Sequence, residues 1–141
     1  MHRLSRTRSA GVRRFDPILA GIDVGLVVGL IVAGQLSHGI SPVVDPLASA
    51  ESVLPFLVGW LTVSILVGLY RPARTVDPFQ AARWSVLCWL AAANVGFLIR
   101  GSPLVDGAVP WEFTVVLTGL GLAVIVPVHV GYVLVRGNQS S

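Results

Sequence analysis

Four long apolar stretches, separated by short connections that carry most of the charge, run over residues 17–36, 53–70, 81–99 and 113–135. Each is close to the ~20 residues that a helix needs to cross a bilayer core of ~30 Å. Apolar and polar residues do not alternate strictly within them, so the pattern indicates helices rather than the strands of a membrane barrel. We therefore expect an all-α protein with four transmembrane helices.

The composition agrees with a membrane protein. Hydrophobic residues make up 54% and charged residues only 12% of the 141 residues, and the mean hydropathy is +0.79. A soluble domain of this size would have too little polar surface. We expect one transmembrane domain over residues 17–136, between an arginine-rich tail (1–16) and a polar tail (137–141).

The arginines predict how the chain lies in the bilayer. All except Arg100 flank the inner ends of the stretches: Arg3, Arg6, Arg8, Arg13, Arg14, Arg71, Arg74, Arg83 and Arg136. Basic residues concentrate on the cytoplasmic side, so we expect a multi-pass protein of the cytoplasmic membrane with both termini in the cytoplasm. Short connections favour antiparallel neighbours and hence an up-down-up-down bundle. The pI near 10.0 does not indicate nucleic-acid binding, because the basic residues only flank the membrane spans.

A cleaved secretion signal is the alternative interpretation of the first stretch. Arg13-Arg14-Phe15 is similar to a twin-arginine start, and Ala48-Ser49-Ala50 to a cleavage site. The stretch is too long for a typical signal core, contains Asp23 and ends well before residue 48. We favour a retained first helix.

Prolines and aromatic residues predict where helices begin and where the interfaces lie. The connection 37–52 is expected over the outer face, with Pro55 in the first turn of the second helix, where no amide donor is needed. Aromatic residues are expected at the outer interface (Trp60 and Trp111) and at the inner one (Tyr70, Trp84 and Tyr132).

Small residues recur at every fourth position of the first stretch, at Gly21, Gly25, Gly29 and Ala33. This spacing lines one helical face with side chains that let another backbone approach closely. Two interpretations are open. We favour contact with a neighbouring helix of the same chain over the seam of a homodimer or of a complex with another membrane protein.

Asp23 lies on the same helix but points away from the small-residue face. It is six residues from Pro17, and His129 is six residues from Val135, so both lie ~9 Å inside the inner end of their helices. A carboxylate in the membrane is costly unless it is paired, and an Asp–His pair could exchange a proton. The alternative is an acid near the inner interface that reaches water or caps a helix.

A second polar group is expected at the outer end, from Gln35, His38, Asn94 and Arg100. Two interpretations of Arg100 are open. We favour a flanking anchor that pairs with Asp106 or Glu112 over a site for an anionic group.

Motifs for catalysis, metal binding or cofactor binding are missing from the sequence. Cys88 is the single cysteine, the histidines lack metal-ligand spacing, and Ser37 beside His38 is not a catalytic arrangement. We favour a non-catalytic structural or interaction subunit, without cofactor, whose surroundings are the lipid bilayer. The alternatives are a proton- or ion-linked carrier, in which Asp23 and His129 relay protons and the outer group meets the solute, and an enzyme.

Several short motifs carry a resemblance to a known family: Asp23, Ser37-His38-Gly39, the stretch from Pro55 to Trp60, the stretch from Gly96 to Arg100, and Gly131-Tyr132 before Arg136. Residues from about 18 to 136 resemble a domain-of-unknown-function family of small prokaryotic membrane proteins with four spans. Tyr132 stands where that family tends to have Trp. The resemblance implies a membrane location and four helices, and it implies no activity.

Overall fold

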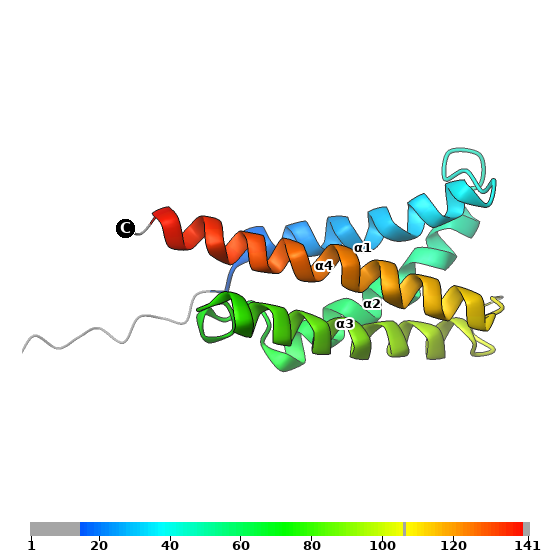
Figure 1. Cartoon of the computed structure of the whole chain (residues 1–141). Coiled ribbons are helices and arrows are strands. Elements are labelled where there is room, and N and C mark those ends of the chain that lie inside the picture. Colours follow the sequence, from blue (N-terminus) through cyan, green and yellow to red (C-terminus); the bar gives the residue numbers. More distant parts are fainter. Residues whose placement is uncertain (1–14, 106, 140–141) are drawn as a thin grey trace, which may run out of the picture.

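A computed structural model describes residues 15–105 and 107–139. It contains four α-helices and one short 3₁₀ helix: α1 (Pro17–Ser37), α2 (Pro46–Val67), η1 (Pro72–Arg74), α3 (Pro78–Arg100) and α4 (Trp111–Gln139) (Figure 1). Each of the four α-helices is long and apolar enough to cross a membrane. The all-α prediction is confirmed. Within the predicted tail 1–16, residues 1–14 with their arginines lie outside the described residues, as does Asp106.

Three helices begin at an Asp-Pro pair: Asp16-Pro17, Asp45-Pro46 and Asp77-Pro78. In each, the Asp carboxylate accepts a hydrogen bond from the backbone amide three residues later, at 3.2, 3.0 and 2.9 Å. The carboxylate thus satisfies one of the amides that a helix start leaves without a partner. Proline suits the next position because it has no amide to satisfy and its φ is already helical.

The predicted start of the second helix is wrong. α2 begins at Pro46, and Pro55 lies buried inside the helix rather than in its first turn. The cap of Asp45 starts the helix early, and Pro55 only removes the amide that would bond the carbonyl of Glu51. At the other end, Gly68 adopts a left-handed conformation with φ 68°, which ends α2 and turns the chain back.

Residues that were predicted to belong to the two tails are part of the helical bundle. Asp16, expected in the N-terminal tail, caps α1, and its backbone amide donates to the carbonyl of Tyr70 at 3.2 Å. The expected polar tail after Arg136 continues α4 as far as Gln139.

The four α-helices are arranged in a ring: consecutive helices contact each other, and α1 also contacts α4. The start of α1, the α2–α3 connection and the end of α4 lie at one end of the bundle (Figure 1). We call this the arginine end, because Arg71, Arg74, Arg83 and Arg136 belong to these segments. The contacts of α1 are less extensive than those within α2–α3 and α3–α4.

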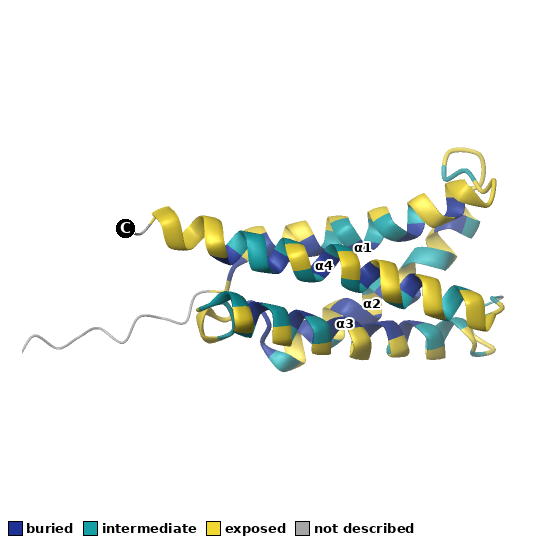
Figure 2. Cartoon of the chain, in the orientation of Figure 1, coloured by how far each residue is buried: buried dark blue, intermediate teal, exposed yellow. Residues whose placement is uncertain are grey.

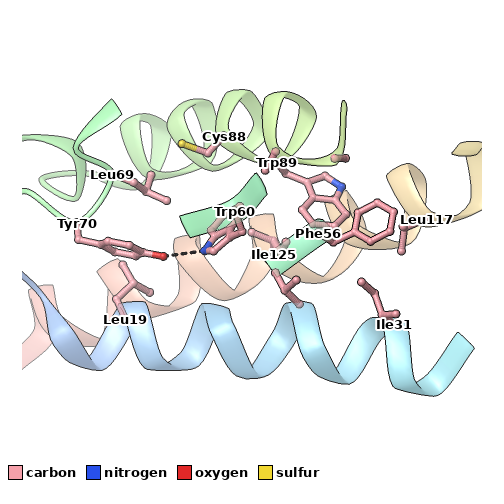
Figure 3. Close-up of a cluster of buried hydrophobic side chains, with 13 residues drawn as sticks. Leu19, Ile31, Phe56, Trp60, Leu69, Tyr70, Cys88, Trp89, Leu117 and Ile125 are labelled. Atoms are coloured by element: carbon pink, nitrogen blue, oxygen red, sulfur yellow. Dashed lines mark hydrogen bonds between the residues drawn. The ribbon is translucent and has the colours of Figure 1, made fainter. Parts of the chain in front are cut away.

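Large aromatic side chains fill the centre of the bundle. Phe56, Trp60 and Trp89 are completely buried and lie between the helices with Leu19, Ile31 and Ile125 (Figure 3). Glycines make room for them: Gly96 lies directly against the ring of Phe56, and Gly121 directly against the indole of Trp89. Many large apolar side chains are exposed instead, as expected of helices in contact with lipid. Exposed positions recur along all four α-helices (Figure 2).

The prediction that Trp60 lies at an interface is wrong, because its indole is part of this core. Tyr70 lies at the arginine end but is also buried, at 3% exposure. Trp111 is exposed at the opposite end, and Trp84 at the arginine end stacks under the guanidinium of Arg74 at 3.4 Å. Side-chain direction, which helical depth alone does not specify, separates the buried aromatics from the exposed ones.

Candidate functional site

Asp23 of α1 and His129 of α4 meet in the interior of the bundle. The Nε2 atom of His129 lies 2.8 Å from Oδ1 and 2.9 Å from Oδ2 of Asp23. Both side chains are 0% exposed. The structure thus brings the predicted pair together, and the alternative of an acid that reaches water or caps a helix does not hold. The capping acid of α1 is Asp16.

Two aromatic side chains continue this contact into a hydrogen-bonded chain. The hydroxyl of Tyr70 donates to Oδ2 of Asp23 at 2.8 Å, and the indole Nε1 of Trp60 donates to the hydroxyl oxygen of Tyr70 at 2.8 Å. Figure 3 shows the Trp60–Tyr70 bond. An indole N–H can only donate, so Tyr70 must accept from it and direct its own proton toward Asp23. Asp23 therefore receives a fixed donor on one side and faces His129 on the other.

Tyr70 is held in its neutral form. It lies in the connection after α2, and burial together with the nearby negative charge of Asp23 raises the pKa of its phenol above the ordinary value. The phenol therefore remains a hydrogen-bond donor. The other contact of the Asp23 carboxylate is with Nε2 of His129.

The second ring nitrogen of His129 has an unusual position. Nδ1 is buried and has no hydrogen-bond partner among the described residues. A buried ring nitrogen without a partner costs about 1–3 kcal/mol whether it is a donor or an acceptor. His129 is therefore held on one side, through Nε2, which is placed to donate to the Asp23 carboxylate.

The network connects α1, α4, α2 and the connection after α2. One turn to either side of Asp23, Leu19 and Val27 are completely buried, so the carboxylate has apolar neighbours along its own helix. In such surroundings hydrogen bonds are strong and an unpaired charge is costly. Through these contacts the site opposes rotation of α1. No group of three or more metal-ligating side chains occurs in the described part of the chain.

The predicted outer polar group does not assemble. Gln35 is buried against Ser49 of α2, whose hydroxyl donates to Oε1 of Gln35 at 2.6 Å while Nε2 of Gln35 donates to the Ser49 carbonyl at 3.1 Å. His38 is exposed at the end of α1. Asn94 is exposed too and donates to the carbonyl of Leu90 in its own helix at 2.7 Å. Periodicity placed these residues at one level without specifying which way each faces.

Arg100 does not form the predicted ion pair with Glu112: the ion pairs among the described residues are His129–Asp23 and Arg136–Asp16. Its guanidinium lies 5.4 Å from the centre of the Phe113 ring, a cation–π contact between the ends of α3 and α4. The other predicted partner, Asp106, lies outside the described residues.

A protein-family model described as "Protein of unknown function (DUF3054)" matches residues 20–132. The chain belongs to this family. The match includes the four residues of the buried network and confirms the resemblance found in the sequence. No curated protein and no solved structure matches the chain. Membership of DUF3054 thus identifies relatives without assigning an activity.

The small-residue face of this DUF3054 chain points away from its own bundle. A Cβ atom placed on Gly21, Gly25 or Gly29 would meet no heavy atom within 4 Å, and Ala33 is exposed. The favoured prediction, contact with a helix of the same chain, is therefore wrong. Asp23 points inward on the opposite side of α1 and leaves the glycines outside. The homodimer interpretation stays a prediction.

Two parts of the polar interior of the DUF3054 chain were missed in the sequence. One is the contribution of Tyr70 and Trp60, which were assigned to interfaces. The other is a cluster at the arginine end, where Asp16 accepts hydrogen bonds from the hydroxyl of Tyr132 at 2.8 Å and from Nη1 of Arg136 at 2.9 Å. The Asp-Pro helix start signals Asp16, and the i, i+4 spacing of Tyr132 and Arg136 places them on one face of a helix.

Proposed function

We propose that this chain is a non-catalytic interaction subunit of a prokaryotic cytoplasmic membrane, with both termini in the cytoplasm, and that α1 is the helix that binds its partner. The distribution of the arginines supports this orientation. One observation carries the role of α1: Asp23 is anchored inside the bundle while Gly21, Gly25 and Gly29 face outward with nothing against them. α1 is thus held by one face and presents the other.

The partner is a second copy of the same chain. A glycine face is useful only if the opposing helix also allows close backbone approach, and the same face of a second α1 meets that requirement. A two-fold axis along this face would repeat every contact on both subunits. The Asp23 network supports this role by fixing the rotation at which α1 presents its small residues.

Cysteine crosslinking in membranes tests this proposal. In a Cys88→Ser background, Gly25→Cys should form a disulfide-linked dimer on mild oxidation. Gly119→Cys is the matched control, because Gly119 is an exposed helical glycine of α4 that also has no atom within 4 Å of an added Cβ. Equal crosslinking at both positions would indicate random collision and refute the α1 interface. A product of different mass would identify another membrane protein in place of a second copy.

A proton-linked carrier is the second candidate, favoured by the 2.8 Å contact between Asp23 and His129. Ionisable residues inside a membrane often belong to proton pathways. A pocket of about 170 Å³ at the arginine end is lined in part by Tyr70 and Ser64, and this would be the route by which protons approach the network.

Proteoliposomes with an imposed pH gradient distinguish the two candidates. If the protein is a carrier, the native chain should conduct protons and the Asp23→Asn variant should not. Asn94→Leu, which changes an exposed polar residue of α3, should retain the flux. Absence of flux in folded native protein would eliminate the carrier.

A further inference from the structure

A second pocket, of about 300 Å³, lies at the arginine end between the α2–α3 connection and the last turns of α4. Its lining residues come from these two segments: Pro72, Thr75 and Val76, and Tyr132, Val133 and Arg136. The pocket is separate from the Asp23–His129 pair and from the small-residue face of α1.

The lining combines apolar side chains with hydrogen-bonding groups. Pro72, Val76 and Val133 supply the apolar part, and the side chains of Thr75, Tyr132 and Arg136 supply hydroxyl and guanidinium groups. This combination suits an amphipathic ligand, with an acceptor group at the polar part and hydrocarbon against the rest.

Asp16 orders the polar part of the pocket. Its carboxylate accepts hydrogen bonds from Nη1 of Arg136 at 2.9 Å and from the hydroxyl of Tyr132 at 2.8 Å. The Asp16 carboxylate would repel an anion, but the contact with Arg136 balances its charge. The Arg136 side chain is 57% exposed and carries five N–H donors in a planar fork, a geometry that suits phosphate oxygens.

The surroundings indicate the charge of the ligand. Arg71 and Arg74 lie in the same connection as Thr75, whereas the acids of this end, Asp16 and Asp77, both cap helices. Val76 is 71% exposed beside the pocket, so the rim is apolar. Because the Asp16–Arg136 pair is neutral, the positive charge around the pocket comes from Arg71 and Arg74 of the neighbouring connection. A pocket with an apolar rim and basic surroundings, at the end of a transmembrane bundle, matches the level of lipid headgroups.

We propose that this pocket binds the headgroup phosphate of an anionic phospholipid. The guanidinium of Arg136 and the hydroxyl of Thr75 contact the phosphate, and the acyl chains extend along the apolar surface of the bundle. The site would hold a lipid at the arginine end whether or not α1 binds a partner.

Native mass spectrometry of the full chain in detergent tests this site. With phosphatidylglycerol and phosphatidylcholine at equal concentration, we expect at least fivefold more of the anionic lipid to be retained. Arg136→Gln should remove this preference. Val76→Trp, which blocks the rim without changing charge or the Asp16 ion pair, should remove it too. Arg83→Gln is the matched control, because Arg83 lies at the same end but does not line the pocket.

Three results would overturn the assignment. Equal retention of the two lipids would show that the site does not select anionic headgroups. A loss in Arg83→Gln as large as in Arg136→Gln would show a diffuse effect of charge. Displacement of the lipid by millimolar inorganic phosphate would identify the ligand as a soluble anion. If Arg136→Gln does not fold, the result for Val76→Trp decides.

Discussion

Removing one partner of the buried pair should destabilise the bundle more than removing both. His129→Leu would leave the Asp23 carboxylate buried with only the hydroxyl of Tyr70 as a donor, and breaking a buried pair in this way costs about 3–5 kcal/mol. Asp23→Leu would leave two buried donors without an acceptor, His129 Nε2 and the Tyr70 hydroxyl. At about 1–3 kcal/mol each, that loss is about 2–6 kcal/mol.

The double variant Asp23→Leu/His129→Leu should recover much of this loss. It leaves only the Tyr70 hydroxyl without an acceptor, at a cost of about 1–3 kcal/mol, and adds apolar side chains of suitable size to an apolar core. We therefore expect the loss in the double variant to be at least ~3 kcal/mol smaller than the sum of the two single losses.

The free energy of unfolding can be measured in mixed micelles with a rising fraction of SDS, followed by the fluorescence of Trp60 and the other tryptophans. Asn94→Leu is the control, because it also exchanges a polar residue within a helix for leucine but at an exposed site, and it should change stability by less than ~0.5 kcal/mol. Additive losses in the single and double variants, or single losses as small as that of the control, would refute the assignment of the pair as a coupled buried site.

Four further changes should separate core positions from exposed ones. Gly121→Val should cost about 1–3 kcal/mol, because its side chain would clash with the indole that α3 packs there, whereas Gly119→Ala should be neutral or slightly stabilising in the same unfolding assay. With Gly29→Cys as the crosslinking residue in the Cys88→Ser background, Gly25→Leu should abolish dimer crosslinking through α1 without lowering the stability of the monomer; a destabilised monomer would place Gly25 in the core. Tyr70→Phe should cost about 1–3 kcal/mol because it leaves the indole N–H of Trp60 and one side of the carboxylate without a partner, and unchanged stability would show that water replaces the hydroxyl.

Hydropathy and helical depth predicted the elements that depend on them. Apolar runs of membrane length specified the four helices, and equal depth from the arginine end placed Asp23 opposite His129. Both inferences use only the rise per residue along straight antiparallel helices. That quantity is the same in every such bundle, so it can be read from the sequence.

Features that depend on side-chain direction or on local capping could not be predicted in this way. The first turns of α2 are too polar for a hydropathy pattern to detect, and the cap of Asp45 was the signal that would have located them. Trp60 lies 14 residues into α2, counted from Pro46 to Trp60, so the early start moves it from the interface to the interior. The glycine spacing identified a face of α1 but contains no information on what that face meets.

Polar contacts at three levels explain the orientation of α1. At the arginine end Asp16 binds side chains of α4, in the middle Asp23 binds His129, and at the opposite end Gln35 binds Ser49 of α2. Asp23, Val27, Ile31 and Gln35 follow one another at four-residue intervals and are all buried, so these contacts extend along one side of the helix.

In an apolar environment each of these contacts opposes rotation, because rotation would leave buried polar groups without partners. A helix with limited apolar contact to its own bundle is therefore held in one orientation by its polar side. Gly21, Gly25 and Gly29 face outward because Asp16, Asp23 and Gln35 hold the opposite side of α1 against the bundle. It follows that Asp23→Asn, with the other two levels intact, should lower stability while leaving the glycine face available for crosslinking.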